Sequence, residues 1–169
     1  MNGLGGMDLK SYHHANLILP RLWLGNKTAA ADPDFLKTAG ITTVFNATKD
    51  LPFSPLVQRK YRVPVDDNLQ PAEIKNMAEW SPEIVYKVIN EYKQGSNILI
   101  HCHAGMQRSA AIMAMTLIAL SGHPASEVMP YIRSRREVAF FPSANFLQSI
   151  LGFEKYYFLA RNSDGSRGN

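Results

Sequence analysis

The stretch NILIHCHAGMQRSAAIMAMTLIAL, residues 97–120, decides how this chain folds. Asn97 to His101 is a short apolar run, typical of a buried strand. Ser109 to Leu120 is apolar on nearly every side, which indicates a buried helix. The residues between them, CHAGMQR, are called the 102–108 loop below. The stretch therefore predicts a strand that turns sharply into a helix, with this loop at the carboxyl end of the strand.

The 102–108 loop has the features of a site for a tetrahedral anion such as phosphate. The first backbone N–H groups of a helix lack partners within the helix, and the positive end of the helix dipole lies with them. An oxyanion fits such a turn. We therefore expect the substrate-binding residues to be those that follow the cysteine: His103, Ala104, Gly105, Met106, Gln107 and Arg108.

Cys102 and Arg108 are the chemically distinctive residues of this loop. A site that holds negative charge favours a thiolate over a thiol, so Cys102 is predicted to be a nucleophile. The planar guanidinium of Arg108 can bind two phosphoryl oxygens at once, which a lysine cannot do in the same way. Gly105 allows the backbone to approach the anion or to adopt a positive φ. A lone cysteine or arginine would suggest only a buried or a solvated side chain, but their combination favours catalysis.

Length and composition favour one intracellular domain with an anionic substrate. The 169 residues, of which 46% are hydrophobic, suffice for one buried core. No apolar run approaches the ~18 residues of a membrane helix, and the N-terminus lacks the pattern of a secretory signal. The single cysteine excludes an intrachain disulfide and favours a cytoplasmic or nuclear location. The net charge of +4 suits an anionic substrate.

Hydrophobic patterns and turn residues predict strands alternating with helices. The expected strands are residues 17–24, 41–45 and 61–65, the last near a sheet edge because Pro64 cannot donate to a ladder. Besides the helix at 109–120, we expect helices over 33–39, from Ser81-Pro82 to Gly95, from Ser126 to Arg136, and from Ser143 onward. This order predicts a single α/β domain: a central, mainly parallel, twisted sheet of about four to five strands with helices on both faces.

The motif His101-Cys102-x5-Arg108-Ser109 resembles the HCxxGxxR[S/T] signature of the cysteine-dependent protein phosphatases. Among these, the chain is most similar to the compact dual-specificity phosphatases, on further features at 22–25, 44–48, 64–67, 133–136 and 142–148. The resemblance implies a catalytic domain over residues 17–160. Residues 1–16 are expected to form a flexible lead-in and residues 161–169 a disordered tail.

This resemblance implies roles for single residues. Cys102 would attack phosphorus, Arg108 would bind the phosphoryl oxygens, Ser109 would assist breakdown of the thiophosphate, and His101 would orient the loop. Expelling an alkoxide from phosphorus requires a proton, and Asp66 and Asp67 are the available acids; family spacing favours Asp67. Arg136 is a candidate for contacting a second anionic group. The family's usual Pro-Asn pair is Pro142-Ser143 here, so the bracing of the loop by the last helix is an open question.

The sequence thus predicts a dual-specificity protein phosphatase that acts on phosphorylated proteins, with no metal, no other cofactor and no membrane partner. One alternative is a phosphatase of RNA 5′ ends or of phosphoinositides; only the RNA alternative brings in a nucleic acid. No lysine occurs in the 102–108 loop, which weakens the lipid alternative. A further alternative is a module that binds phosphorylated partners without turnover.

Overall fold

A five-stranded sheet forms the centre of the computed structural model, which describes the backbone of residues 7–168 and the side chains of residues 7–162. The strands are β1 (Ala15–Leu19), β2 (Leu22–Gly25), β3 (Thr43–Asn46), β4 (Arg59–Arg62) and β5 (Ile98–His101), in the spatial order β1-β2-β5-β3-β4. β1 is antiparallel to β2, and all other neighbours are parallel. The predicted α/β class and mainly parallel sheet are confirmed. The strand expected over 61–65 does lie at a sheet edge, but it runs from Arg59 to Arg62, so Pro64 follows the strand instead of lying within it.

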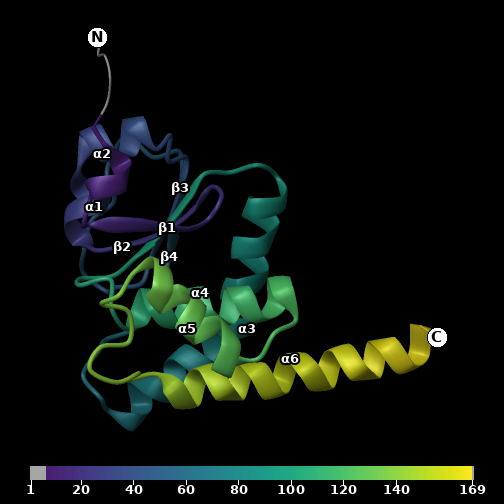
Figure 1. The fold of residues 1–169 in the computed structure, drawn as a ribbon. Coiled ribbons are helices and arrows are strands. Elements are labelled where there is room, and N and C mark those ends of the chain that lie inside the picture. Colours follow the sequence, from purple (N-terminus) through teal and green to yellow (C-terminus); the bar gives the residue numbers. More distant parts are fainter. Residues whose placement is uncertain (1–6, 169) are drawn as a thin grey trace.

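Helices cover both faces of this sheet (Figure 1). In β5, Ile98 and Ile100 face a core formed with α3 (Pro71–Lys93), α4 (Arg108–Ser121), α5 (Ala125–Arg135) and α6 (Leu147–Gly168). Leu99 faces the opposite side, where α1 (Lys27–Ala31), α2 (Pro33–Thr38) and the short 3₁₀ helix η1 (Leu9–Ser11) lie. Because successive side chains of a strand point to opposite faces, a strand that is apolar throughout requires cover on both sides.

The first predicted strand, 17–24, is wrong as a single element. The chain forms a hairpin instead, because Pro20 and Arg21 make a turn in which Arg21 has a φ of 68°. The guanidinium of Arg21 donates to the carbonyl oxygens of Tyr92 and Ser96 at 3.1 and 2.8 Å. These contacts hold the turn against the end of α3.

The helix expected to begin at Ser81-Pro82 begins instead at Pro71 and continues through Pro82. A proline inside a helix cannot donate to the carbonyl four residues earlier, here that of Ala78. The hydroxyl of Ser81 donates to Ala78 O at 2.7 Å and satisfies it. Ser81 therefore supports the helix at Pro82 rather than capping its start.

The last helix also differs from the prediction. It begins at Leu147 rather than after Ser143, and a turn over residues 144–147 precedes it, with Leu147 N donating to Ala144 O. Its helical backbone continues over residues 161–168, where the sequence suggested a disordered tail, and it projects from the body of the molecule (Figure 1). Of the predicted lead-in at 1–16, residues 1–6 lie outside the described residues, whereas η1 and the start of β1 are ordered elements.

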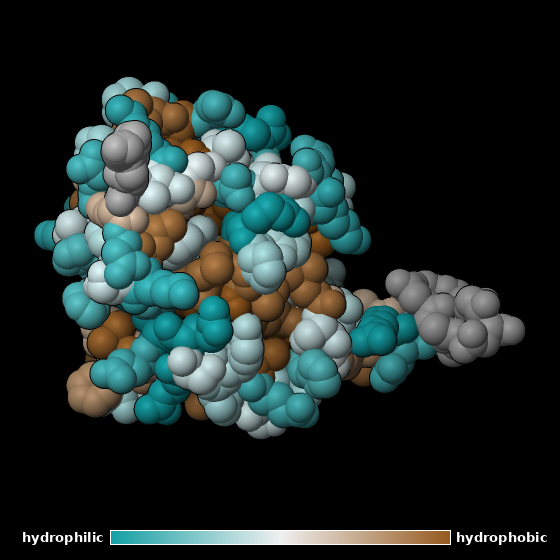
Figure 2. Space-filling model, turned by 45° about the horizontal axis from the view of Figure 1, so that its top comes forward, coloured by the Kyte–Doolittle hydropathy of each residue, from teal (hydrophilic) through white to brown (hydrophobic). Residues whose placement is uncertain are grey.

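None of the described helices combines the length and apolarity needed to cross a membrane. Figure 2 shows a surface that is mostly hydrophilic, with apolar side chains gathered near the middle of the face in view.

Candidate active site

The 102–108 loop lies where the central strand β5 ends and α4 begins, at the carboxyl edge of the parallel strands. This edge is where α/β sheets commonly bind ligands. Cys102 is 2% exposed, and its Sγ lies 3.1 Å from the Oγ of Ser109 in the first turn of α4. A pocket of about 270 Å³ opens over the thiol. Its lining is Asp67, Cys102, His103, Ala104, Met106, Gln107, Arg108, Phe141, Pro142 and Asn145.

Arg108 is the first residue of α4 and is nearly buried, at 7% exposure. Its Nη1 donates to the carbonyl of Val65 at 2.9 Å, which directs the guanidinium along the wall of the pocket. Its Nε is buried and meets no hydrogen-bond acceptor among the described residues. A buried donor without a partner is costly, and an oxyanion in the pocket would satisfy it.

The middle of the loop is packed too tightly for a side chain. Gly105 has a φ of +69°, and a Cβ there would lie 2.5 Å from the carbonyl oxygen of Gly25. Arg136 lies against the same point: its Nε and Nη2 donate to the carbonyls of Gly105 and Ala104 at 2.9 and 3.1 Å. With these carbonyls held outward, the loop can turn its N–H groups toward the pocket.

Arg136 is thus placed to support the loop and not, as the sequence suggested, to contact a second anionic group. It is 4% exposed, and its Nη1 donates to His13 O and to the side chain of Asn16. Burial lowers the pKa of this guanidinium from its ordinary value. Four of its five N–H donors are therefore bound within the fold, and its burial keeps it away from a ligand.

Gln107 links the 102–108 loop to the segment that contains Pro142-Ser143. Its buried side chain reaches the segment before α6, with Nε2 donating to the carbonyls of Phe141 and Ser143 at 3.1 and 2.8 Å. Its Oε1 accepts from the backbone N–H of Asn145 at 2.9 Å. The glutamine therefore fixes the segment before α6 to the loop through backbone atoms, so an asparagine at position 143 is not needed. The sequence offered no signal for this role.

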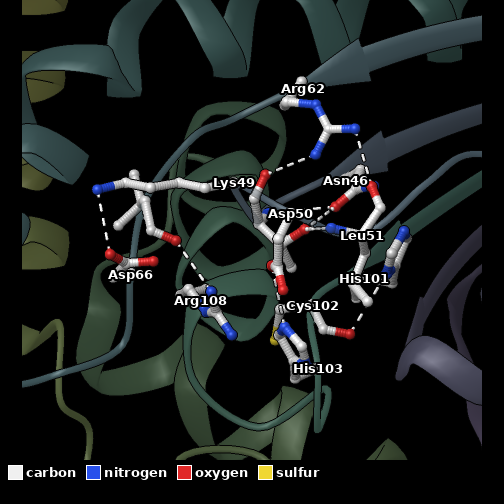
Figure 3. A network of polar contacts seen from close by, with 12 residues as sticks. Asn46, Lys49, Asp50, Leu51, Arg62, Asp66, His101, Cys102, His103 and Arg108 are labelled. Atoms are coloured by element: carbon white, nitrogen blue, oxygen red, sulfur yellow. Dashed lines mark hydrogen bonds and ion pairs between the residues drawn. The ribbon is translucent and has the colours of Figure 1, made fainter.

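The two aspartates lie differently with respect to the pocket. Asp67 lines it and accepts a hydrogen bond from Asn145 Nδ2 at 2.8 Å. Asp66 pairs with Lys49 at 3.1 Å, and its backbone N–H donates to Glu73. Figure 3 shows the Lys49–Asp66 pair to one side of Arg108. The geometry thus favours Asp67 as the acid and gives Asp66 a part in holding the loop.

The two loop histidines have separate surroundings. His101 lies beneath the loop, 1% exposed, with Nδ1 positioned 3.3 Å from Cys102 O, and burial lowers its pKa to about 4. It is therefore neutral at pH 7 and donates from Nδ1. His103 lies at the mouth of the pocket, with its Nε2 3.2 Å from a carboxylate oxygen of Asp50 (Figure 3).

Asp50 is a residue that sequence reasoning missed. The hydrogen bond from His103 lowers the pKa of its carboxyl. Asp50 follows β3, which is paired with β5, so its place beyond the carboxyl end of a neighbouring strand was a usable signal. Asn145 was missed as well, since nothing in its sequence position links it to Asp67.

The site as a whole suits a tetrahedral oxyanion held over a thiol. Unpaired N–H groups at the start of α4, the free Nε of Arg108 and the hydroxyl of Ser109 are donors, and Asp67 supplies a carboxyl at the rim. Among the side chains of residues 7–162, His, Cys, Asp and Glu do not gather in threes or more as a metal site would require.

Comparisons with known proteins point to one family. The model of the dual specificity phosphatase catalytic domain matches residues 22–156. Dual specificity protein phosphatase 2 of Mus musculus is 31% identical over 139 residues, covering 81% of this chain and 42% of the relative. Dual specificity protein phosphatase 1-A of Xenopus laevis is 30% identical over 139 residues, covering 81% and 36%. The chain thus spans less than half the length of these curated relatives.

The fold has solved counterparts as well. A mouse putative dual specificity phosphatase, complexed with zinc tungstate, superimposes with a TM-score of 0.78 at 25% identity and covers 93% of this chain and 96% of its own. The fold is therefore that of a known architecture.

Proposed function

Because this chain belongs to the dual specificity phosphatase family, we propose that it hydrolyses phosphotyrosine and phosphoserine or phosphothreonine in proteins through a cysteinyl-phosphate intermediate. The observation that carries the proposal is the pocket in which Cys102, the unpartnered Nε of Arg108 and the carboxyl of Asp67 meet at the start of α4. Such a set holds a phosphoryl group, supplies a nucleophile and supplies an acid.

In the first step the Cys102 thiolate attacks phosphorus, so that an S–P bond forms as the P–O bond to the substrate breaks. Arg108 and the backbone N–H groups of the loop hold the phosphoryl oxygens and stabilise the charge that develops on them. Asp67, protonated, gives its proton to the departing serine, threonine or tyrosine oxygen. The dephosphorylated protein then leaves.

In the second step water attacks the cysteinyl phosphate, and the S–P bond breaks. Asp67, now a carboxylate, takes the proton from the water. Ser109, whose Oγ lies 3.1 Å from Sγ, donates a hydrogen bond to the thiolate that departs. His101 and Arg136 hold the loop from beneath through the carbonyls of Cys102, Ala104 and Gly105.

A substrate panel tests this proposal against its alternatives. Phosphotyrosine and phosphothreonine peptides, a phosphoinositide and a 5′-triphosphate RNA are offered to the wild type and to Cys102→Ser. We expect phosphate release from both peptides by the wild type and none by the variant. Phosphate release from the phosphoinositide alone, or from the RNA alone, would mean that the substrate is a lipid or an RNA and not a protein. Tight peptide binding without release by the wild type would make the chain a binding module.

A further inference from the structure

The turn that precedes α6 carries one side chain that reaches across the pocket to the loop of the acid. Asn145 Nδ2 donates to Asp67 Oδ1 at 2.8 Å, although 78 positions separate the two residues. Both line the pocket over Cys102. Within residues 7–162, this contact is the only hydrogen bond or ion pair that the Asp67 side chain makes. Neither family spacing nor the two-step chemistry requires it.

Asn145 is itself held firmly. Its backbone N–H donates to Gln107 Oε1, and the Nε2 of the same glutamine binds the carbonyls of Phe141 and Ser143. Gln107 adjoins Arg108, so the amide of Asn145 has a fixed position relative to the residue that would bind the phosphoryl group. Asp67, in contrast, is exposed on a loop between β4 and α3.

We propose that Asn145 is a positioning residue that holds the carboxyl of Asp67 over the phosphoryl site; the inference rests on the proposed function. The amide hydrogen bond makes Oδ1 an acceptor in both protonation states. The acidic proton then resides on Oδ2, the oxygen left free to face the leaving group. An acid held in this way is already oriented toward the leaving group, so the transition state does not carry the entropy cost of orienting it.

The test compares Asn145→Ala and Asn145→Asp with the wild type. Alanine keeps the backbone N–H that Gln107 accepts, and aspartate keeps the shape of asparagine but cannot donate to a carboxylate. Gln148→Ala, at the exposed second residue of α6, is the matched control. The measured quantity is the single-turnover rate of Cys102 phosphorylation by phenyl phosphate, whose leaving group is basic, and by para-nitrophenyl phosphate, whose leaving group is acidic.

Both Asn145 variants should slow the reaction of phenyl phosphate roughly tenfold and that of para-nitrophenyl phosphate by less than about twofold, since only the first needs the proton. In an Asp67→Asn background, Asn145→Ala should add almost nothing, because a positioning residue acts through the group that it positions. The control should match the wild type with both substrates.

Equal losses on both substrates, or an Asn145 effect that adds in full to that of Asp67→Asn, would overturn the positioning role and make Asn145 a structural residue. Wild-type rates in Asn145→Asp would overturn it as well. If Asp67→Asn itself shows no dependence on the leaving group, the acid assignment fails and the positioning role fails with it. If the rate depends on the leaving group in Asp67→Asn but not in the Asn145 variants, the positioning role of Asn145 is refuted and the acid role of Asp67 stands.

Discussion

Asp66 and Asp67 are adjacent, yet their surroundings give them different chemistry. Lys49 neutralises the carboxyl of Asp66, and Glu73 accepts its backbone N–H, so this residue ties the loop to α3. Asp67 turns toward the pocket over Cys102. One peptide unit thus separates a structural carboxylate from the proposed acid.

Asp67→Asn should slow reaction with alkyl and phenyl phosphates strongly while sparing substrates with acidic leaving groups, because only the former need a proton in the transition state. The basic limb of its pH–rate profile should also flatten. Leaving-group series for Asp67→Asn and Asp66→Asn measure both effects, and Asp66→Asn is the matched control. Selectivity in Asp66→Asn instead would move the acid by one residue; selectivity in neither would place it outside this loop.

His101 should make the stability of the fold depend on pH. Its pKa is about 4 in the folded protein and near 6.5 when exposed, so the unfolded chain takes up the proton first as pH falls. The contribution of His101 to the unfolding free energy is fully present above about pH 7. The unfolding free energy should fall by roughly 3 kcal/mol between pH 6.5 and 4. Urea unfolding of the wild type across this range measures the loss.

In that measurement, His101→Asn should remove most of the pH dependence between 6.5 and 4, whereas His123→Asn, which alters an exposed histidine, should keep it. An unchanged pH dependence in His101→Asn would show that the buried imidazole is not the group responsible.

At the scale of elements, the 102–108 loop depends on contacts that come from distant parts of the chain. Arg136, at the end of α5, and Gln107, through the segment before α6, hold the loop from two sides. The strand-loop-helix core could be predicted from the sequence, because its apolar runs and its Cys-Gly-Arg spacing are local. The hairpin turn at Arg21 and the start of α3 could not, because tertiary contacts and the Ser81 hydroxyl outweigh the local signals.

Gln107→Ala should loosen the segment before α6 without touching the nucleophile. Three hydrogen bonds of a buried amide are lost, which costs roughly 1–3 kcal/mol of unfolding free energy. KM for a phosphopeptide should rise, because Arg108 and Asn145 lose their common support. Urea unfolding and steady-state kinetics check both effects, with Gln148→Ala as control. Unchanged stability and KM would mean that the three hydrogen bonds of the Gln107 side chain support neither the fold nor the site.

Across the whole molecule, the candidate active site and a buried network that stabilises the fold lie at opposite ends of the parallel strands. The carboxyl ends of the parallel strands hold the site, whereas the amino ends meet at Glu91, which is fully buried. Its carboxylate accepts from Arg59, Tyr61, Thr43 and Ser96, and so joins β3, β4 and the segment before β5 to α3. The Cys-x5-Arg motif could be predicted from sequence, but this network could not, since a glutamate within a helical pattern usually indicates an exposed face.

Glu91→Ala should therefore lower the unfolding free energy by about 2–3 kcal/mol, because it leaves the buried hydroxyl of Thr43 and the partly buried hydroxyls of Tyr61 and Ser96 without their acceptor. At temperatures where the variant stays folded, kcat should equal that of the wild type. Glu83→Ala, which removes a half-exposed carboxylate of the same helix, should cost less than about 0.5 kcal/mol. A fall in kcat with unchanged stability would contradict the separation.

The most direct test of the whole account is to find the phosphoryl group on the enzyme. Ser109→Ala should slow breakdown of the intermediate by removing the hydroxyl that lies 3.1 Å from Sγ. After rapid acid quenching of this variant with a phosphopeptide, mass spectrometry should locate one phosphoryl group on Cys102, and Cys102→Ser should carry none there. Phosphate release at the full wild-type rate with the phosphoryl group on another residue, or on none, would contradict the mechanism.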